Sequence, residues 1–350
     1  MNPVSMKTVA LLCFTQNGAK IGERLKQRAE KRYSFSGFVS SRFIGESGLE
    51  KTDLSLSDWT REWFKKADCL VFVGACGIAV RAIAPFVRDK FTDPAVVVID
   101  EQGKYCISLM SGHMGGANEF AQDFASQLDA QPIITTATDL NQKFAVDLFA
   151  KRNQLFLTDR SLAKEISAVL LAGQPVCFQS EFPFEGRLPE GLVSESGETN
   201  FKIQVGFSVP TQKNTLWLIP KNLVLGIGCR KGTEKQVIEQ MVLHTLQSHS
   251  LPIESVSAAA SIDLKAEELG LVSFCKEYGI SFETYSAEQL SRVKGDFSSS
   301  EFVSKITGVD NVCERSAVKA SKGRLLIPKQ KGNGVTCAVA VNREQICLKF

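Results

Sequence analysis

The sequence predicts an α/β protein of two lobes built on mostly parallel sheets with flanking helices. Short apolar runs typical of buried strands alternate with longer segments of helical period, which is the pattern of parallel strands covered by helices. A chain of 350 residues, at a typical ~150 residues per domain, has room for two to three domains. Hydrophobic residues at 44% and charged residues at 23% lie in the globular range, which excludes a disordered or collagen-like chain.

In the first half, the periodicity predicts strands connected by helices. A strand at 8–15 precedes an amphipathic helix at 18–30, in which Ile21, Leu25 and Ala29 share one face. The residues from Asp100 to Gly103 have the polar side chains and late glycine of a hairpin turn. The other elements expected here are a helix at 57–66, strands at 69–73, 95–99 and 105–110, a helix at 115–128 and a strand at 132–135.

In the second half, Pro220 precedes a new strand at 223–227, and this restart is the clearest domain boundary. We expect an N-terminal α/β domain at 1–135, a middle region at 136–222 and a C-terminal α/β domain at 223–350. The other elements expected are two helices within 141–171, a strand at 176–179, irregular structure at 180–200, a helix at 233–249, a strand at 253–256, a helix at 264–278, a strand at 281–285, short helices up to 307, a helix near 316–320 and a closing strand at 335–341.

Charge and composition exclude several classes of function. The 41 Lys and Arg against 38 Asp and Glu leave a net charge of +3, too little for a protein that coats nucleic acid. No apolar run approaches the roughly 18 residues of a membrane helix, and the N-terminus lacks the features of a signal peptide. The 10 cysteines include no C-x-x-C pair, which indicates core thiols in a reducing cytoplasm, and with 3 histidines we expect no metal site.

The first candidate loop follows the strand at 69–73. Gly74 and Gly77 let the chain turn tightly and present backbone N–H groups at a helix start, where an anion binds. Arg81 and Lys90 come next and supply positive charge for the same anion. The glycine spacing fits neither the dinucleotide fingerprint nor the P-loop. The alternative is that both glycines only turn the chain and that Arg81 is a surface residue.

The second candidate loop surrounds His113, which lies among glycines directly before a helix. Few neighbouring side chains are available to bury this imidazole, so we expect it to meet a ligand as a general base or as an axial metal ligand. Backbone N–H groups at Gly115 and Gly116 are candidates to stabilise an oxyanion. The alternative is a capping or surface histidine. The residues expected at this site are Ser111, Gly112, His113, Gly115, Gly116, Asn118 and Glu119.

The third candidate loop follows the strand at 132–135. Thr135, Thr136 and Thr138 place three hydroxyls beside the carboxylate of Asp139, where they can bind substrate or cap the next helix. Ligands of open parallel sheets bind outside the carboxyl ends of strands, so we expect all three loops to meet at one edge. Arg230 and Lys231, after the strand at 223–227, mark a possible fourth loop of this kind.

These loops are also where the chain resembles a known family, the CbiG family of cobalt-precorrin-5A hydrolases in anaerobic cobalamin biosynthesis. The element S-G-H-x-G-G-A-N is highly specific, and the resemblance covers nearly the whole chain in order. Residues 1–50 and 151–220 carry no matching motif. The matching stretches are GACGIAVRAIAP at 74–85, DPAVVVIDEQG at 93–103, SLMSGHMGGANEFA at 108–121, ITTATD at 134–139, LGIGCRKGT at 225–233, SAAASIDLKAEELGL at 257–271 and GVDNVCERSAV at 308–318.

The resemblance implies opening of a lactone ring on a cobalt-containing corrinoid precursor, with loss of two carbons as acetaldehyde. Such a small-molecule tetrapyrrole substrate is large and polyanionic, and its cobalt is part of the substrate, so no separate cofactor is expected. Among the loop residues, His113, Glu119 and Asp139 are our candidates for proton transfer. A non-catalytic corrinoid carrier or accessory protein of the same pathway is the alternative. Other enzymes of that pathway are possible partners; nucleic acid and membrane are not.

Overall fold

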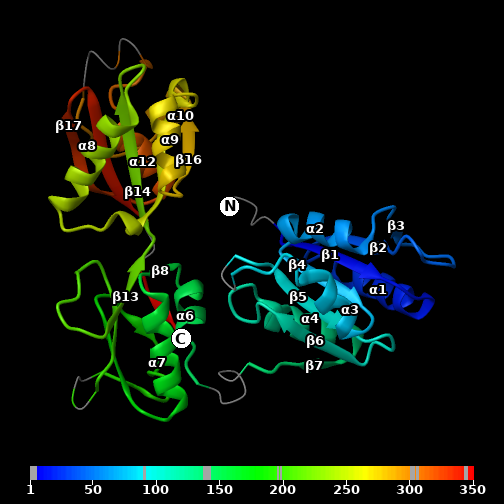
Figure 1. Ribbon diagram of the computed structural model, residues 1–350. Coiled ribbons are helices and arrows are strands. Elements are labelled where there is room, and N and C mark those ends of the chain that lie inside the picture. Colours follow the sequence, from blue (N-terminus) through cyan, green and yellow to red (C-terminus); the bar gives the residue numbers. More distant parts are fainter. Residues whose placement is uncertain are drawn as a thin grey trace. The chain divides into compact units, whose positions relative to one another are not determined.

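The computed structural model describes residues 6–89, 92–136, 143–194, 197, 199–299, 304, 307–342 and 346–350. The chain divides into two compact units, Met1–Leu148 and Phe149–Phe350, which are described separately below. Across those residues no helix is long and apolar enough to cross a membrane. Both units combine mostly parallel sheets with flanking helices, which confirms the predicted α/β class (Figure 1).

The first unit has a seven-stranded sheet in the order β3-β2-β1-β4-β5-β6-β7 (Figure 1). The neighbours from β3 to β5 are all parallel, β6 is antiparallel to β5, and β7 is parallel to β6. The sequence did not predict β2 or β3. The strands are β1 (Thr8–Cys13), β2 (Ser34–Val39), β3 (Glu50–Lys51), β4 (Cys69–Val73), β5 (Ala95–Ile99), β6 (Tyr105–Met110) and β7 (Gln131–Ile133).

Helices cover both faces of this sheet, because successive residues of its central strands point to opposite faces and are apolar on both. Leu11 and Val97 belong to a core shared with α1 (Gln16–Ala29) and α4 (Ala117–Leu128). Their neighbours in sequence pack on the opposite face against α2 (Leu56–Lys66) and α3 (Cys76–Ile83). The helix expected from residue 57 begins one residue earlier, because Ser55 caps α2 by accepting a hydrogen bond from the backbone N–H of Asp58.

The hairpin between β5 and β6 reverses the direction of the sheet. The Asp100 carboxylate accepts backbone hydrogen bonds from Lys104 at 2.7 Å and Tyr105 at 2.6 Å, which fixes the turn as the sequence predicts. Since β6 and β7 run opposite to β4, their carboxyl ends lie at the other end of the sheet. The expectation that the three candidate loops share one edge is therefore wrong.

The second unit contains two five-stranded sheets, one ending at Pro220 and the other beginning at Leu223. The first has the order β11-β9-β12-β13-β8, and β10 pairs with β19 near the C-terminus. The predicted helices and β9 are present, whereas β8, β12 and β13 were not predicted. The elements are α6 (Val146–Arg152), β8 (Leu155–Leu157), α7 (Arg160–Leu171), β9 (Val176–Ser180), β10 (Phe184–Glu185), β11 (Leu192–Val193), β12 (Lys202–Val205), β13 (Thr215–Pro220) and β19 (Leu348–Lys349).

The last sheet has the order β16-β15-β14-β18-β17. Strands β14, β15 and β16 are parallel, β18 is antiparallel to β14, and β17 is antiparallel to β18. Helices α8 and α9 share a core with one face of this sheet. On the other face α12 crosses Gly226, where a Cβ would lie 1.7 Å from the carbonyl oxygen of Cys313. The elements are β14 (Leu223–Cys229), α8 (Lys235–Gln247), β15 (Val256–Ile262), α9 (Leu269–Glu277), β16 (Ser281–Tyr285), α10 (Ala287–Ser291), α12 (Cys313–Ser321), β17 (Arg324–Gly332) and β18 (Val335–Val341).

Candidate functional site

The loop after β6 folds back on itself before α4 begins. Ser111 adopts a left-handed conformation with φ 57°, which few residues other than glycine do, and turns the chain sharply out of the strand. Gly115 then passes so close that a Cβ on it would lie 2.5 Å from the Cβ of Ser111. A side chain at Gly115 would therefore force this turn apart.

Three backbone N–H groups at the junction of this loop and α4 donate to carbonyl oxygens of the loop itself. The N–H groups of Gly116, Ala117 and Asn118 each donate at 3.1 Å, to the carbonyl oxygens of His113, Ser111 and Gly112 respectively. Contrary to the sequence expectation, the N–H of Gly116 is thus already paired and does not face an anion. The N–H of Gly115 has no hydrogen-bond acceptor within the described residues and is a candidate donor to an oxyanion.

His113 lies beside a carboxylate that the sequence analysis missed. Its Nδ1 is 3.5 Å from Oδ1 of Asp147, and the two side chains are only 14% and 17% exposed. Asp147 stands in the first turn of α6, 34 positions further along the chain. A carboxylate at Nδ1 fixes the orientation of an imidazole. The only local sequence signal for Asp147 was an acidic residue at a helix start. That signal did not identify a partner of His113, because acidic residues are favoured at helix N-termini in general.

Asn118 connects three segments of the site through hydrogen bonds. It is 7% exposed, accepts a hydrogen bond from the Ser108 hydroxyl at 2.6 Å, and donates one to the Thr136 hydroxyl at 3.1 Å. These contacts connect β6, α4 and the segment after β7, so the second and third candidate loops do lie together. Thr135, next to Thr136, is exposed. The Ser111 hydroxyl is buried with no hydrogen-bond partner in the described chain, so in this conformation a ligand cannot reach it.

Other predicted site residues lie elsewhere or cannot be placed. Glu119 is 67% exposed and pairs with Lys7 at 3.8 Å on the outer side of α4. Gly74, Gly77 and Arg81 stand at the carboxyl end of β4, opposite the His113 loop. The remaining predicted residues, Lys90, Thr138 and Asp139, fall outside the described residues.

Arg230 and Lys231 belong to the second unit, where they follow β14. They line an open pocket of about 1710 Å³ at the carboxyl ends of β14 and β15. Elsewhere in the described parts of the chain, no group of three or more His, Cys, Asp or Glu side chains has the arrangement of a metal site. The candidate functional residues thus lie in two separate regions, the His113 loop and this pocket.

Comparison with known proteins gives similarity along nearly the whole chain. Residues 58–139 match the family model for the N-terminal part of cobalamin synthesis protein G, and residues 223–340 match the model for its C-terminus. The cobalt-precorrin-5A hydrolase of Salmonella typhimurium is 34% identical over 354 residues, covering 97% of this chain and 99% of that protein. The enzyme of the same name from Priestia megaterium is 32% identical, covering 95% and 94%.

Among solved structures, one similar chain is CobE, a protein from the cobalamin (vitamin B12) biosynthetic pathway. It is 28% identical over a match that covers 35% of this chain and 92% of that chain, with a TM-score of 0.33.

Proposed function

Because this chain belongs to the CbiG family, we infer that it is a cobalt-precorrin-5A hydrolase of cobalamin biosynthesis. It opens the lactone ring of cobalt-precorrin-5A and releases acetaldehyde, giving cobalt-precorrin-5B. The observation that carries this conclusion is the 34% identity to a cobalt-precorrin-5A hydrolase over 97% of the chain. Since the similar curated proteins are named as hydrolases, the alternative of a non-catalytic carrier is not favoured.

The arrangement of His113 and Asp147 supports a role in lactone opening. In this proposal His113, oriented by the Asp147 carboxylate at its Nδ1, is the base that accepts a proton from water as that water attacks the lactone carbonyl. The carbonyl oxygen becomes an oxyanion, and the Gly115 N–H, which has no acceptor among the described residues, is our candidate to stabilise it. Collapse of this tetrahedral intermediate breaks the ring C–O bond and leaves a carboxylic acid and an alcohol.

Release of acetaldehyde requires a second proton transfer. The freed hydroxyl must lose its proton while the adjacent carbon–carbon bond breaks, and the electron pair of that bond passes to the macrocycle. His113 can return the first proton to the leaving alkoxide and then act as a base again. In this proposal Glu119 takes no part, because it lies exposed on the other side of α4 beside Lys7.

We propose that no separate cofactor takes part, since the cobalt arrives within the substrate. The hydrogen bond from Asn118 to Thr136 holds the segment after β7 beside the His113 loop, where we propose that one edge of the tetrapyrrole lies. A cytoplasmic location and contacts with other enzymes of the pathway are further parts of the proposal, motivated by the ten unpaired thiols and by the transfer of intermediates that such a pathway requires.

A direct test is incubation of the purified protein with cobalt-precorrin-5A while acetaldehyde is assayed. The hydrolase predicts one acetaldehyde per corrinoid consumed, with a gain of one water in the combined mass of the products. A carrier would bind the corrinoid without releasing acetaldehyde and without adding water to it. Corrinoid binding without acetaldehyde would therefore overturn the proposed function.

A further inference from the structure

The pocket after β14 has the size of a site for a large ligand. Its volume of about 1710 Å³ exceeds the ~300–1,000 Å³ typical of pockets for drug-sized molecules. It opens at the carboxyl ends of two parallel strands, the position where α/β sheets bind ligands. Its described lining includes no histidine, so the residues around it are suited to holding a ligand rather than to proton transfer near neutral pH.

Positive charge dominates the lining. Six basic side chains face three acidic ones, Glu234, Glu267 and Glu268. Two of the basic groups, Lys235 and Lys265, already pair with glutamates at 2.5 Å and 2.7 Å. The other four make no ion pair with any described residue and remain available to an anion. These four are Arg230, Lys231, Lys329 and Lys331.

The turn that carries Arg230 and Lys231 is held in place from two sides. The Arg230 N–H donates to the carbonyl of Gly334 in the β17–β18 hairpin at 3.2 Å, and the Gly232 N–H donates to the Glu268 carboxylate at 2.7 Å. Burial raises the pKa of Glu268, but hydrogen bonds from Lys265 and Gly232 outweigh it, so the pKa is lowered on balance. Glu268 therefore stays ionised and keeps the turn in position.

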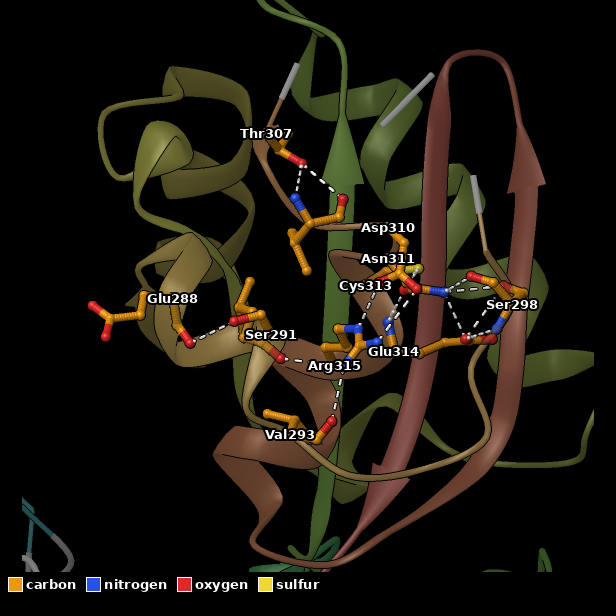
Figure 2. Close-up of polar contacts among 12 residues, drawn as sticks. Glu288, Ser291, Val293, Ser298, Thr307, Asp310, Asn311, Cys313, Glu314 and Arg315 are labelled. Atoms are coloured by element: carbon orange, nitrogen blue, oxygen red, sulfur yellow. Dashed lines mark hydrogen bonds and ion pairs between the residues drawn. The ribbon is translucent and has the colours of Figure 1, made fainter. Parts of the chain in front are cut away.

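The wall formed by α12 is fixed by a buried network around Glu314, which Figure 2 shows. This carboxylate is 1% exposed and accepts hydrogen bonds from the side chain of Asn311 at 2.6 Å and from the backbone of Ser298 at 2.8 Å and Lys329 at 2.7 Å. Asn311, Cys313 and Lys329 all line the pocket. The network thus sets the backbone from which the Lys329 side chain extends.

Two leucines add an apolar surface to this cationic pocket. Leu264 is 68% exposed and Leu269 is 80% exposed, although both are large aliphatic side chains. They line the same pocket as the four available cations. Exposed aliphatic groups beside unpaired cations match a ligand that has both a flat apolar body and peripheral negative charges.

We propose that this pocket binds one side of a polycarboxylate tetrapyrrole. Leu264 and Leu269 pack against the face of the macrocycle, while Lys329, Lys331 and the Arg230 turn pair with its peripheral carboxylates. The identity of the natural ligand as the cobalt-precorrin substrate rests on the proposed function. The chemical class of the ligand rests on the pocket alone.

The test uses uroporphyrin, a fluorescent porphyrin with eight carboxylates, and the full-length protein. We expect K329E/K331E to bind it at least tenfold more weakly than wild type, because each lost charged contact weakens binding roughly tenfold or more. L264N/L269N should lose roughly three- to tenfold, because less apolar surface is covered. The matched controls are K276E/K294E and L326N, exposed positions of the same unit outside the pocket; they should bind as wild type does.

Thermal unfolding of each variant shows that folding is retained, and R230A serves as a second variant if the double one fails to fold. Binding by all pocket variants that equals wild type would overturn the proposal. Equal weakening by the controls would also overturn it, since net charge alone would then explain the effect. The acetaldehyde assay remains separate: a wild type that binds uroporphyrin in this pocket yet releases no acetaldehyde contradicts the hydrolase function and leaves the pocket supported.

Discussion

The loop at His113 and the pocket after β14 differ in both chemistry and construction. The first places an imidazole beside a carboxylate and connects an amide to two hydroxyls, but the N–H groups of Gly116, Ala117 and Asn118 are already paired within its own turn. The second has four available cations and two exposed leucines around about 1710 Å³, but no histidine in its described lining. The contrast teaches that groups suited to proton transfer and groups suited to holding a large anion lie in separate units of this chain.

The largest effect should come from H113A. If the first region performs the chemistry, turnover falls by roughly 10² to 10⁴, the usual contribution of a positioned acid–base group, while uroporphyrin binding stays unchanged. Initial rates of acetaldehyde release and fluorescence titrations measure the two effects. H244A, which alters an exposed histidine on α8, is the control. Wild-type turnover of H113A between pH 6 and 8 would remove His113 from the mechanism.

The second effect concerns how the pocket is built. E314A removes the acceptor of several buried donors, which should destabilise the second unit by on the order of 3 kcal/mol. Hydrogen exchange should become faster in α12 and β17 while the strands of the first unit stay protected. E288A, which removes a 73% exposed carboxylate, is the control. Equal protection of α12 in E314A and wild type would show that the network does not hold this wall.

The third effect tests whether Asp147 acts through His113. D147N keeps the shape of the side chain but removes the charge that orients the imidazole, so we expect kcat to fall by up to about a hundredfold with little change in KM. D147E should recover part of the rate, which a merely structural role would not predict. D129N, at an 83% exposed position, is the control. A rise in KM with unchanged kcat would instead make Asp147 a substrate-binding residue.

The same contrast explains how much the sequence could predict. Strands with continuous apolar runs, such as β4 and β5, were predicted with their observed bounds, because burial on both faces leaves a strong local signal. β17 and β12 were missed, since their Lys, Arg and Gln residues resemble a loop. The loop around His113 was predicted from its glycines. Its partner Asp147 was not, because that contact depends on the path of the chain between them.

A fourth, smaller effect should depend on pH. The folded-state pKa of Glu268 is depressed, so the stability that its ionised form contributes is fully present above the unfolded-state pKa of about 4.3. That contribution is lost as the pH falls through the lower folded-state value. Wild type should therefore be more stable than E268Q at pH 7, and the difference should be smaller at about pH 4, just below the unfolded-state pKa. Urea unfolding at both pH values measures it, and a difference that grows on acidification would contradict the assignment.

The smallest effect is expected from R81A, although the sequence alone suggested a substrate carboxylate for this side chain. Arg81 is exposed and lies near Gly77 at the carboxyl end of β4, whereas the His113 loop follows β6, which runs the opposite way. A substrate held at the His113 loop has no need of that end of the sheet. KM and uroporphyrin affinity should then stay within about twofold of wild type, as for an ordinary surface substitution. A loss of roughly tenfold to 150-fold, which is what one charge-assisted contact contributes, would instead place a substrate carboxylate at the Gly74 turn. The Gly74 turn would then be a third substrate-binding region, besides the His113 loop and the pocket after β14.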